Sequence, residues 1–144
     1  MTSSTAPLGR ILIIAGSDSG AGAGIQADLK TVMALGGYGA TAITAVTVQN
    51  TLGVSAVHPI PVEIVLAQAR AVLGDIGADA IKTGMLGDVA MVEAVASLLD
   101  EATGLPAVID PVMIAKGGAA LLPDAADRKS TRLNSSHVLI SYSV

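Results

Sequence analysis

The stretch ILIIAGSDSGAGAGIQADL, residues 11–29, decides the fold. It opens with a short, continuous apolar run, which is typical of a strand buried on both faces of a parallel sheet. The run ends at Gly16, and a loop rich in Ser and Gly leads to Ile25, where an apolar helical stripe begins. A strand, a glycine-rich loop and a helix in this order predict the start of a β-α-β unit.

The same alternation continues along the chain. The first helix is expected to carry Ile25, Leu29, Val32, Met33 and Leu35 inward and to stop at the glycine pair 36–37. Residues 39–50 are rich in Thr and Val and predict one strand, and the proline-containing segment 53–61 predicts a short edge strand. Further predicted elements are a helix with Pro61 in its first turn, a strand at residues 78–84, a helix capped by Asp88 and a strand at residues 106–110.

Strands that alternate with helices of this length predict an α/β domain with a mostly parallel sheet. We expect a flexible N-terminus over residues 1–9, one domain over residues 10–126, and a segment of different composition from Asp127 onward. The two later helices carry apolar residues at helical spacing, which predicts that both pack on the sheet.

Composition excludes several classes of function. Hydrophobic residues make up 51% of the 144 residues and charged residues 14%, which is typical of a chain with a buried core. The net charge of −4 and the absence of Phe and Trp argue against nucleic acid and anionic membranes as partners. The chain has no Cys, no secretory signal pattern and no apolar run of about 18 residues, so we expect a cytoplasmic protein.

In an open parallel sheet, ligands bind beyond the carboxyl ends of the strands. The segments that follow the predicted strands are residues 16–24, 47–50, 83–86 and 110–118. These segments hold most of the chain's unusual residues. We therefore expect the functional site at this edge of the sheet.

The glycine-rich loop leaves two alternatives open. Gly20, Gly22 and Gly24 alternate before a helix N-terminus, where backbone N–H groups can bind an anion or admit a ring close to the chain. The loop can equally be a tight turn without a ligand, because it matches neither a Walker A nor a G-x-G-x-x-G pattern.

Three further side chains are candidates for binding a heterocycle. The carboxylate of Asp28 lies one turn into the first helix, where the helix dipole favours it. The amide of Gln49 offers a donor and an acceptor to a ring edge, and the thioether of Met85 suits a ring wall. The ordinary alternatives are a helix-end charge, a turn amide and a core methionine.

Phosphate or metal binding has weaker candidates. Lys82 and Lys116 can each bind phosphate as a point charge, although a single surface lysine is usually only solvated. Asp110 follows the last predicted strand within DPVMIAKGG, which places it near a possible metal or phosphate. No paired-histidine metal spacing and no Ser/His/Asp constellation is present in the sequence.

Three motifs together carry a family resemblance. They are AGSDSGAGAGIQADLKTVMALGGYGATAITAVTVQNTLGV, IKTGMLGD and VIDPVMIAKGGAALL, in this order. From about residue 10 to about residue 125, the chain resembles the hydroxymethylpyrimidine/phosphomethylpyrimidine kinases of thiamine biosynthesis. The resemblance implies a ribokinase-like fold, a three-layer α/β/α arrangement with a mostly parallel sheet, here truncated.

The resemblance also implies an activity. These kinases use ATP and Mg²⁺ to phosphorylate 4-amino-5-hydroxymethyl-2-methylpyrimidine and then its monophosphate. Carried over by position, the substrate site comprises Gly16, Asp28, Gln49, Met85 and Val112. Asp110 and Lys116 fall in the vicinity of the phosphate or metal, and a homodimer is implied for the full-length protein.

The chain departs from the family in one respect. In the family, the catalytic residue, its anion hole, the acidic Mg²⁺ motif and most of the ATP pocket lie in a second half that is not recognisable here. We therefore expect this chain to be inactive, and most simply an inert fragment. The alternatives are a pyridoxal-type kinase of the same fold and a non-catalytic fragment that binds the pyrimidine.

The last residues predict a non-native tail. The segment DRKSTRLNSSH, which begins at Asp127, resembles the translation of a common short-read sequencing adapter. The final ISYSV differs from the adapter reading only at Ser143, where Ala is expected. We expect residues 127–144 to carry no function, and resequencing of the locus would test this.

Overall fold

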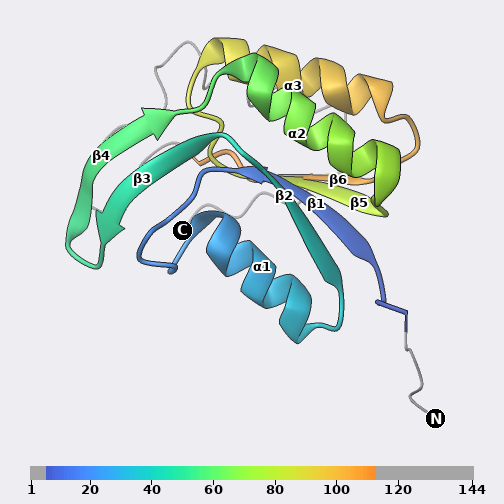
Figure 1. Ribbon diagram of the computed structural model, residues 1–144, viewed down its shortest axis with the longest axis horizontal. Coiled ribbons are helices and arrows are strands. Elements are labelled where there is room, and N and C mark those ends of the chain that lie inside the picture. The colour runs from blue at the N-terminus through green and yellow to red at the C-terminus, as the bar shows by residue number, and fades with distance from the viewer. Residues whose placement is uncertain (1–5, 113–144) are drawn as a thin grey trace.

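The computed structural model describes residues 6–112, whose arrangement Figure 1 shows. Its elements are β1 (Arg10–Ala15), α1 (Gly24–Ala34), β2 (Tyr38–Ile43), β3 (Ala45–Asn50), β4 (Gly53–Pro59), α2 (Val62–Asp75), β5 (Ala80–Thr83), α3 (Val89–Glu101) and β6 (Ala107–Ile109). The predicted tail at residues 127–144, Lys116, and residues 1–5 of the expected flexible N-terminus lie outside the described residues.

The main sheet is parallel and has the strand order β2-β1-β5-β6. Helix α1 covers one face, and α2 and α3 cover the other (Figure 1). The predicted three-layer α/β/α fold is therefore confirmed for this part of the chain. Among the described residues, no helix combines the length and the apolar character needed to cross a membrane.

Strand β1 contributes side chains to the cores on both faces of the sheet. Leu12 and Ile14 pack against α2 and α3, whereas Ile13 and Ala15 pack on the side of Ile25 in α1. All four strand side chains are fully buried. Burial of a large aliphatic side chain stabilises a fold by about 1.5–3 kcal/mol, which explains why this strand is apolar on both faces.

The prediction of one strand over residues 39–50 is wrong. The chain bends at Thr44, so that β2 stays in the main sheet while β3 leaves it and pairs antiparallel with β4. Thr44 is buried at the bend, where its backbone N–H donates to Ala15 and its carbonyl accepts from Ile60. These tertiary hydrogen bonds set the boundary, and no glycine or proline marks it in the sequence.

Strand β4 is confirmed as an edge strand and lies within the predicted segment 53–61. Within the described residues it pairs with β3 alone, and Pro59 is its last residue. The β3–β4 ribbon projects beyond the end of the main sheet (Figure 1). The ribbon therefore lies beside the carboxyl ends of the parallel strands.

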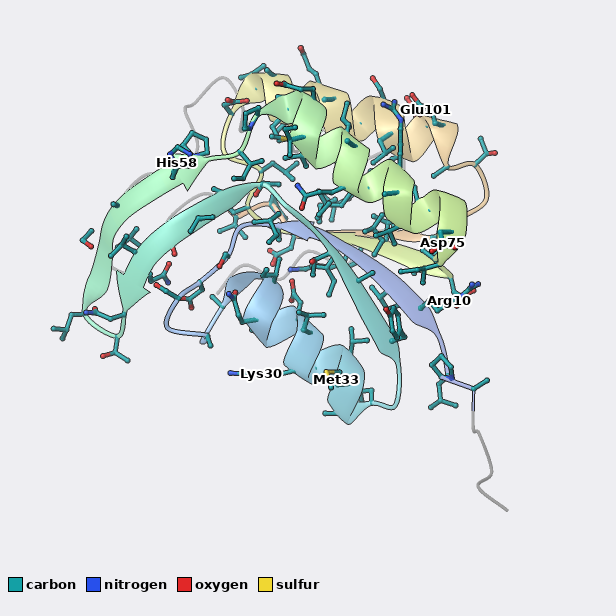
Figure 2. The ribbon with its side chains drawn as sticks, in the orientation of Figure 1. Arg10, Lys30, Met33, His58, Asp75 and Glu101 are labelled. Atoms are coloured by element: carbon teal, nitrogen blue, oxygen red, sulfur yellow. The ribbon has the colours of Figure 1, made fainter. Side chains whose placement is uncertain are left out.

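The inward stripe predicted for α1 is partly wrong. Ile25 is buried, and Leu29 and Val32 pack beside it, but Met33 and Leu35 are each 70% exposed. Figure 2 shows Met33 on the side of α1 away from the sheet. Residues four and seven positions after Ile25 share its helix face, whereas positions eight and ten fall on the flanks of that face.

The other two helices match their predictions closely. Asp88 caps α3, where its carboxylate accepts a hydrogen bond of 2.8 Å from the backbone N–H of Met91. The apolar residues of both helices pack on the sheet as predicted. Those of α3 are buried, and those of α2 are buried or packed against the same core, namely Met91, Val92, Val95, Leu98 and Leu99 in α3 and Val62, Val65, Leu66, Ala69, Val72 and Leu73 in α2. Pro61 lies at the N-cap of α2, just ahead of the first turn.

Candidate functional site

A cavity of about 490 Å³ opens at the carboxyl ends of the parallel strands. Its walls come from the loop after β1, the first turns of α1, the end of β3 and the residues after β5 and β6. The sequence-predicted residues Gly16, Asp28, Gln49, Met85, Asp110 and Val112 all line it. The four segments that sequence reasoning placed at this edge therefore converge here as far as the described residues extend.

Gly16 and Met85 lie against each other in the cavity wall. A Cβ atom on Gly16 would lie 2.5 Å from the Cε atom of Met85, so a larger residue there would require the methionine side chain to move. Thr44 fixes the backbone of Met85, because its Oγ1 donates a hydrogen bond of 2.7 Å to the Met85 carbonyl. The thioether is therefore positioned by the bend between β2 and β3.

Gln49 lies at an irregularity in the β3–β4 ribbon. The register shifts between Val48 and Gln49, and such bulges re-aim side chains near functional sites. The Oγ of Ser19 accepts a 2.7 Å hydrogen bond from the Gln49 N–H and donates a 2.8 Å hydrogen bond to the Gln49 carbonyl. Because Ser19 holds the backbone, the Gln49 amide remains at the cavity, with Thr47 Oγ1 at 3.5 Å.

A lysine bridges two acids in the cavity wall. Lys82 Nζ lies 2.7 Å from Asp28 Oδ2 and 3.6 Å from Asp110 Oδ2. The Lys82 and Asp28 side chains are 22% and 24% exposed, which places this pair partly inside the protein. Sequence reasoning weighed Lys82 as a phosphate ligand, but in the structure its ammonium group is paired with carboxylates.

The glycine-rich loop folds around the carboxylate of its own Asp18. The carboxylate of Asp18 accepts hydrogen bonds from the backbone N–H groups of Gly20, Gly22 and Ala23, at 2.8, 2.9 and 2.8 Å. Asp18 is 5% exposed. Of the two alternatives left open by the sequence, this arrangement favours a structured turn over an anion site.

Sequence reasoning missed the roles of Asp18, Ser19 and Lys82. Asp18 lies two residues before Gly20, a spacing typical of an aspartate whose side chain hydrogen-bonds to the backbone two residues on. This spacing is the one signal in the sequence that indicates the role of Asp18. Ser19 and Lys82 act through partners at least 28 residues away in the chain, which no local pattern reveals.

The described residues do not by themselves form a Mg²⁺ site. No group of three or more His, Cys, Asp or Glu side chains that could hold a metal occurs within residues 6–112. Magnesium in kinases is held by one or two carboxylates together with substrate phosphates. Asp110, whose side chain is 39% exposed, can supply one such carboxylate, and Lys116 lies outside the described residues.

Comparison with known proteins gives a consistent picture. The family model described as phosphomethylpyrimidine kinase matches residues 18–140. The chain is 56% identical over 122 residues to a hydroxymethylpyrimidine/phosphomethylpyrimidine kinase of Streptomyces coelicolor, covering 85% of this chain and 44% of that protein. It is 57% identical over 115 residues to the Bacillus subtilis kinase of the same name, covering 80% and 42%. The chain thus spans less than half the length of these curated relatives.

Solved structures show the same relationship. A phosphomethylpyrimidine kinase of Clostridium difficile 630 is similar with a TM-score of 0.77 and 45% identity, covering 83% of this chain and 52% of that chain. A pyridoxal kinase of Staphylococcus aureus, solved with AMP-PCP, is similar with a TM-score of 0.77 and 34% identity, covering 94% and 50%. Both matches place the described fold within one group of vitamin kinases.

Proposed function

Because the chain belongs to the phosphomethylpyrimidine kinase family, we propose that it supplies the substrate side of a thiamine-biosynthesis kinase. The proposed reaction is ATP-dependent phosphorylation of 4-amino-5-hydroxymethyl-2-methylpyrimidine, here called the aminopyrimidine, and then of its monophosphate. One observation carries the proposal. Residues that the family motifs assign to the substrate come from distant parts of the chain and line one cavity of about 490 Å³.

The chemistry of the walls suits a planar, neutral heterocycle. Gln49 presents a side-chain amide, whose donor and acceptor can pair with the amino group and ring nitrogen of an aminopyrimidine. Met85 and Val112 supply apolar walls, and Gly16 lines the same cavity, with the Met85 methyl packed against it. Small preformed pockets with few polar groups are typical of such ligands.

We propose that Asp28 binds the hydroxymethyl group of the substrate. A carboxylate accepts hydrogen bonds from a hydroxyl group, and Asp28 lines the cavity from the first turns of α1. The 2.7 Å hydrogen bond from Lys82 restrains the carboxylate in this position. Asp28 is thus expected to orient the hydroxymethyl oxygen that receives the phosphoryl group.

ATP and Mg²⁺ belong to the same proposal. The S. aureus pyridoxal kinase was solved with the ATP analogue AMP-PCP, which supports ATP as the phosphoryl donor in this group. Phosphoryl transfer depends mainly on positioning and on neutralising the transferred phosphate. The described residues are proposed to position the heterocycle, and Asp110 is proposed to lie in the vicinity of the phosphate or its metal. We also propose a cytoplasmic protein that forms a homodimer at full length.

A pyridoxal-type kinase is the second candidate function. A structure of the S. aureus pyridoxal kinase with pyridoxal bound is among the similar proteins, at 39% identity and a TM-score of 0.70. Because pyridoxal is also a planar ring with a hydroxymethyl group, we propose that the side-chain amide of Gln49 discriminates between the two ligands. This amide can hydrogen-bond to the amino group and the ring nitrogen of the aminopyrimidine.

Calorimetric titration of the full 144-residue chain tests the proposal. We expect the aminopyrimidine to bind at least about tenfold more tightly than pyridoxal, which is the effect of one well-formed hydrogen bond of about 1.4 kcal/mol. Gln49→Leu should abolish this preference. Val46→Ala is the matched control, because Val46 lies on the same strand, is 48% exposed and does not line the cavity.

Tighter binding of pyridoxal would favour the second candidate. If the native chain bound neither ring, the reading as an inert fragment would hold.

A further inference from the structure

The Asp18 carboxylate is a buried charge that the proposed reaction does not use. It is 5% exposed, and both of its oxygens accept backbone hydrogen bonds. Gly20 permits this approach, since a Cβ atom there would lie 3.2 Å from Asp18 Oδ1. A buried carboxylate is costly unless its oxygens are hydrogen-bonded, and here three amides satisfy it.

The rest of the loop is held around this carboxylate. The N–H of Ala21 donates to the Asp18 carbonyl at 2.9 Å, and Lys30 Nζ donates to the Ala21 carbonyl at 2.9 Å. Ala21 has a φ of 58°, a left-handed conformation that a non-glycine residue adopts only when its surroundings impose it. The loop is therefore held in one conformation at the cavity wall.

The carboxylate also takes the place of an anion at the start of α1. Ala23 is the N-cap of this helix and makes no side-chain capping bond, while its own N–H donates to Asp18. The amide of Ile25, the second residue of the helix, donates to the Gly16 carbonyl at 3.0 Å. Helix N-termini of this kind bind phosphate in other proteins, but here the chain supplies its own negative charge.

We propose that Asp18 is a positioning residue, an internal anion that closes the Gly20–Ala23 loop against phosphate and shapes it for the heterocycle. The inference rests on the proposed function, because it assigns the loop to the ring side of the substrate. It also predicts that the phosphates of the donor and of the monophosphate substrate bind elsewhere. Loss of the carboxylate should open a vacant set of amides that a small free anion can fill.

The experiment compares the native chain with Asp18→Ala and Asp18→Asn. Amide hydrogen exchange at Gly20, Gly22 and Ala23 is measured by NMR, and aminopyrimidine affinity is measured by calorimetry. Sodium formate is the probe for rescue, because formate replaces the carboxylate that alanine lacks, and sodium chloride controls for ionic strength. Asp88→Ala is the matched control, since Asp88 also accepts a backbone amide at a helix start but does not line the cavity.

We expect Asp18→Ala to raise exchange at the three amides by about tenfold or more and to weaken aminopyrimidine binding by about tenfold. Formate, but not chloride, should reverse both effects. Asp18→Asn keeps one acceptor oxygen, so its exchange rates and its aminopyrimidine affinity should lie between those of the native chain and Asp18→Ala. It also provides a second variant in case Asp18→Ala does not fold. In the native chain, inorganic phosphate should leave the three amide resonances unchanged.

Two results would overturn the inference. One is a phosphate-dependent shift of the three amides in the native chain. The other is exchange in Asp18→Ala or Asp18→Asn that matches the native chain, or that formate does not slow. Failure of the native chain to bind the aminopyrimidine would contradict the proposed function instead, and the exchange and formate measurements would still decide the role of Asp18.

Discussion

Lys82 holds two acids of the cavity wall with one ammonium group. The 2.7 Å contact with Asp28 is a hydrogen-bonded ion pair, whereas the 3.6 Å contact with Asp110 is looser. Without Lys82, two carboxylates would face each other in a partly buried site. Its main effect is thus to offset the repulsion between the two carboxylates. The phosphate-binding role considered from the sequence is not needed to explain Lys82.

We predict that Lys82→Met lowers the free energy of unfolding by about 2 kcal/mol, because it leaves partly buried charges unpaired. Combined with Asp28→Asn in a double-mutant cycle, it should give a coupling energy above about 1 kcal/mol. The matched control is the Arg70–Glu101 pair, whose side chains are 54% and 56% exposed. Exposed pairs couple by about 0–1 kcal/mol, and equal coupling in both cycles would contradict the prediction.

At the scale of elements, an ion pair ties the start of β1 to the turn before β5. The Nη2 atom of Arg10 donates to Asp79 Oδ1 at 2.8 Å, and its Nη1 atom donates to the Ile76 carbonyl at 2.6 Å. Figure 2 shows Arg10 beside the end of α2. The Arg10 side-chain hydrogen bond, joined by one from the Arg10 backbone, lowers the pKa of Asp79 to about 2.

This lowered pKa predicts a loss of stability in acid. In an unfolded chain an aspartate has a pKa of about 3.9, so the lower pKa of Asp79 in the folded state means that folding favours its charged form. The stabilisation is complete above the unfolded pKa and is lost as pH falls from about 4 to about 2. Urea unfolding of the native chain and of Asp79→Asn across this range measures the effect, with Asp75→Asn as the control. An unchanged pH dependence in Asp79→Asn would refute it.

The elements differ in how much the sequence reveals. The apolar run of β1 and the stripes of α2 and α3 are local patterns, and the structure confirms them. The bend at Thr44 and the exposure of Met33 depend on which surface each segment meets, and no local pattern reports that. The family motifs predicted the residues that line the cavity, whereas the internal anion at Asp18 and the Ser19 clamp required the three-dimensional contacts.

At the scale of the whole molecule, the described residues form a cavity that we propose to be the substrate side of a kinase site. The cavity has apolar walls, an amide and an acid, and the loop amides that would suit a phosphate are engaged by Asp18. The curated relatives in this family are more than twice as long as the matched segment, since it covers 44% and 42% of their lengths. Under the proposed function, we therefore expect substrate binding and phosphoryl transfer to be separable in this chain.

We predict that the full 144-residue chain binds the aminopyrimidine without turning over ATP. The physical reason is that transfer requires groups that neutralise the transferred phosphate. Among the described residues that line the cavity, the one cationic side chain is Lys82, and it is paired with Asp28 and Asp110. A coupled assay for ADP, with and without the aminopyrimidine, measures this. Aminopyrimidine-dependent ADP formation at an ordinary enzyme rate would show that the chain carries a complete site.

Methionine methyl NMR tests whether the cavity between Gly16 and Val112 holds the pyrimidine ring. We predict that titration with the aminopyrimidine shifts the Met85 methyl resonance, because the aromatic ring would lie against that thioether. Met33, 70% exposed on α1, and Met91, buried in α3, serve as internal controls and should not move. An unmoved Met85 resonance at saturating aminopyrimidine, or equal shifts at all three methionines, would contradict the account.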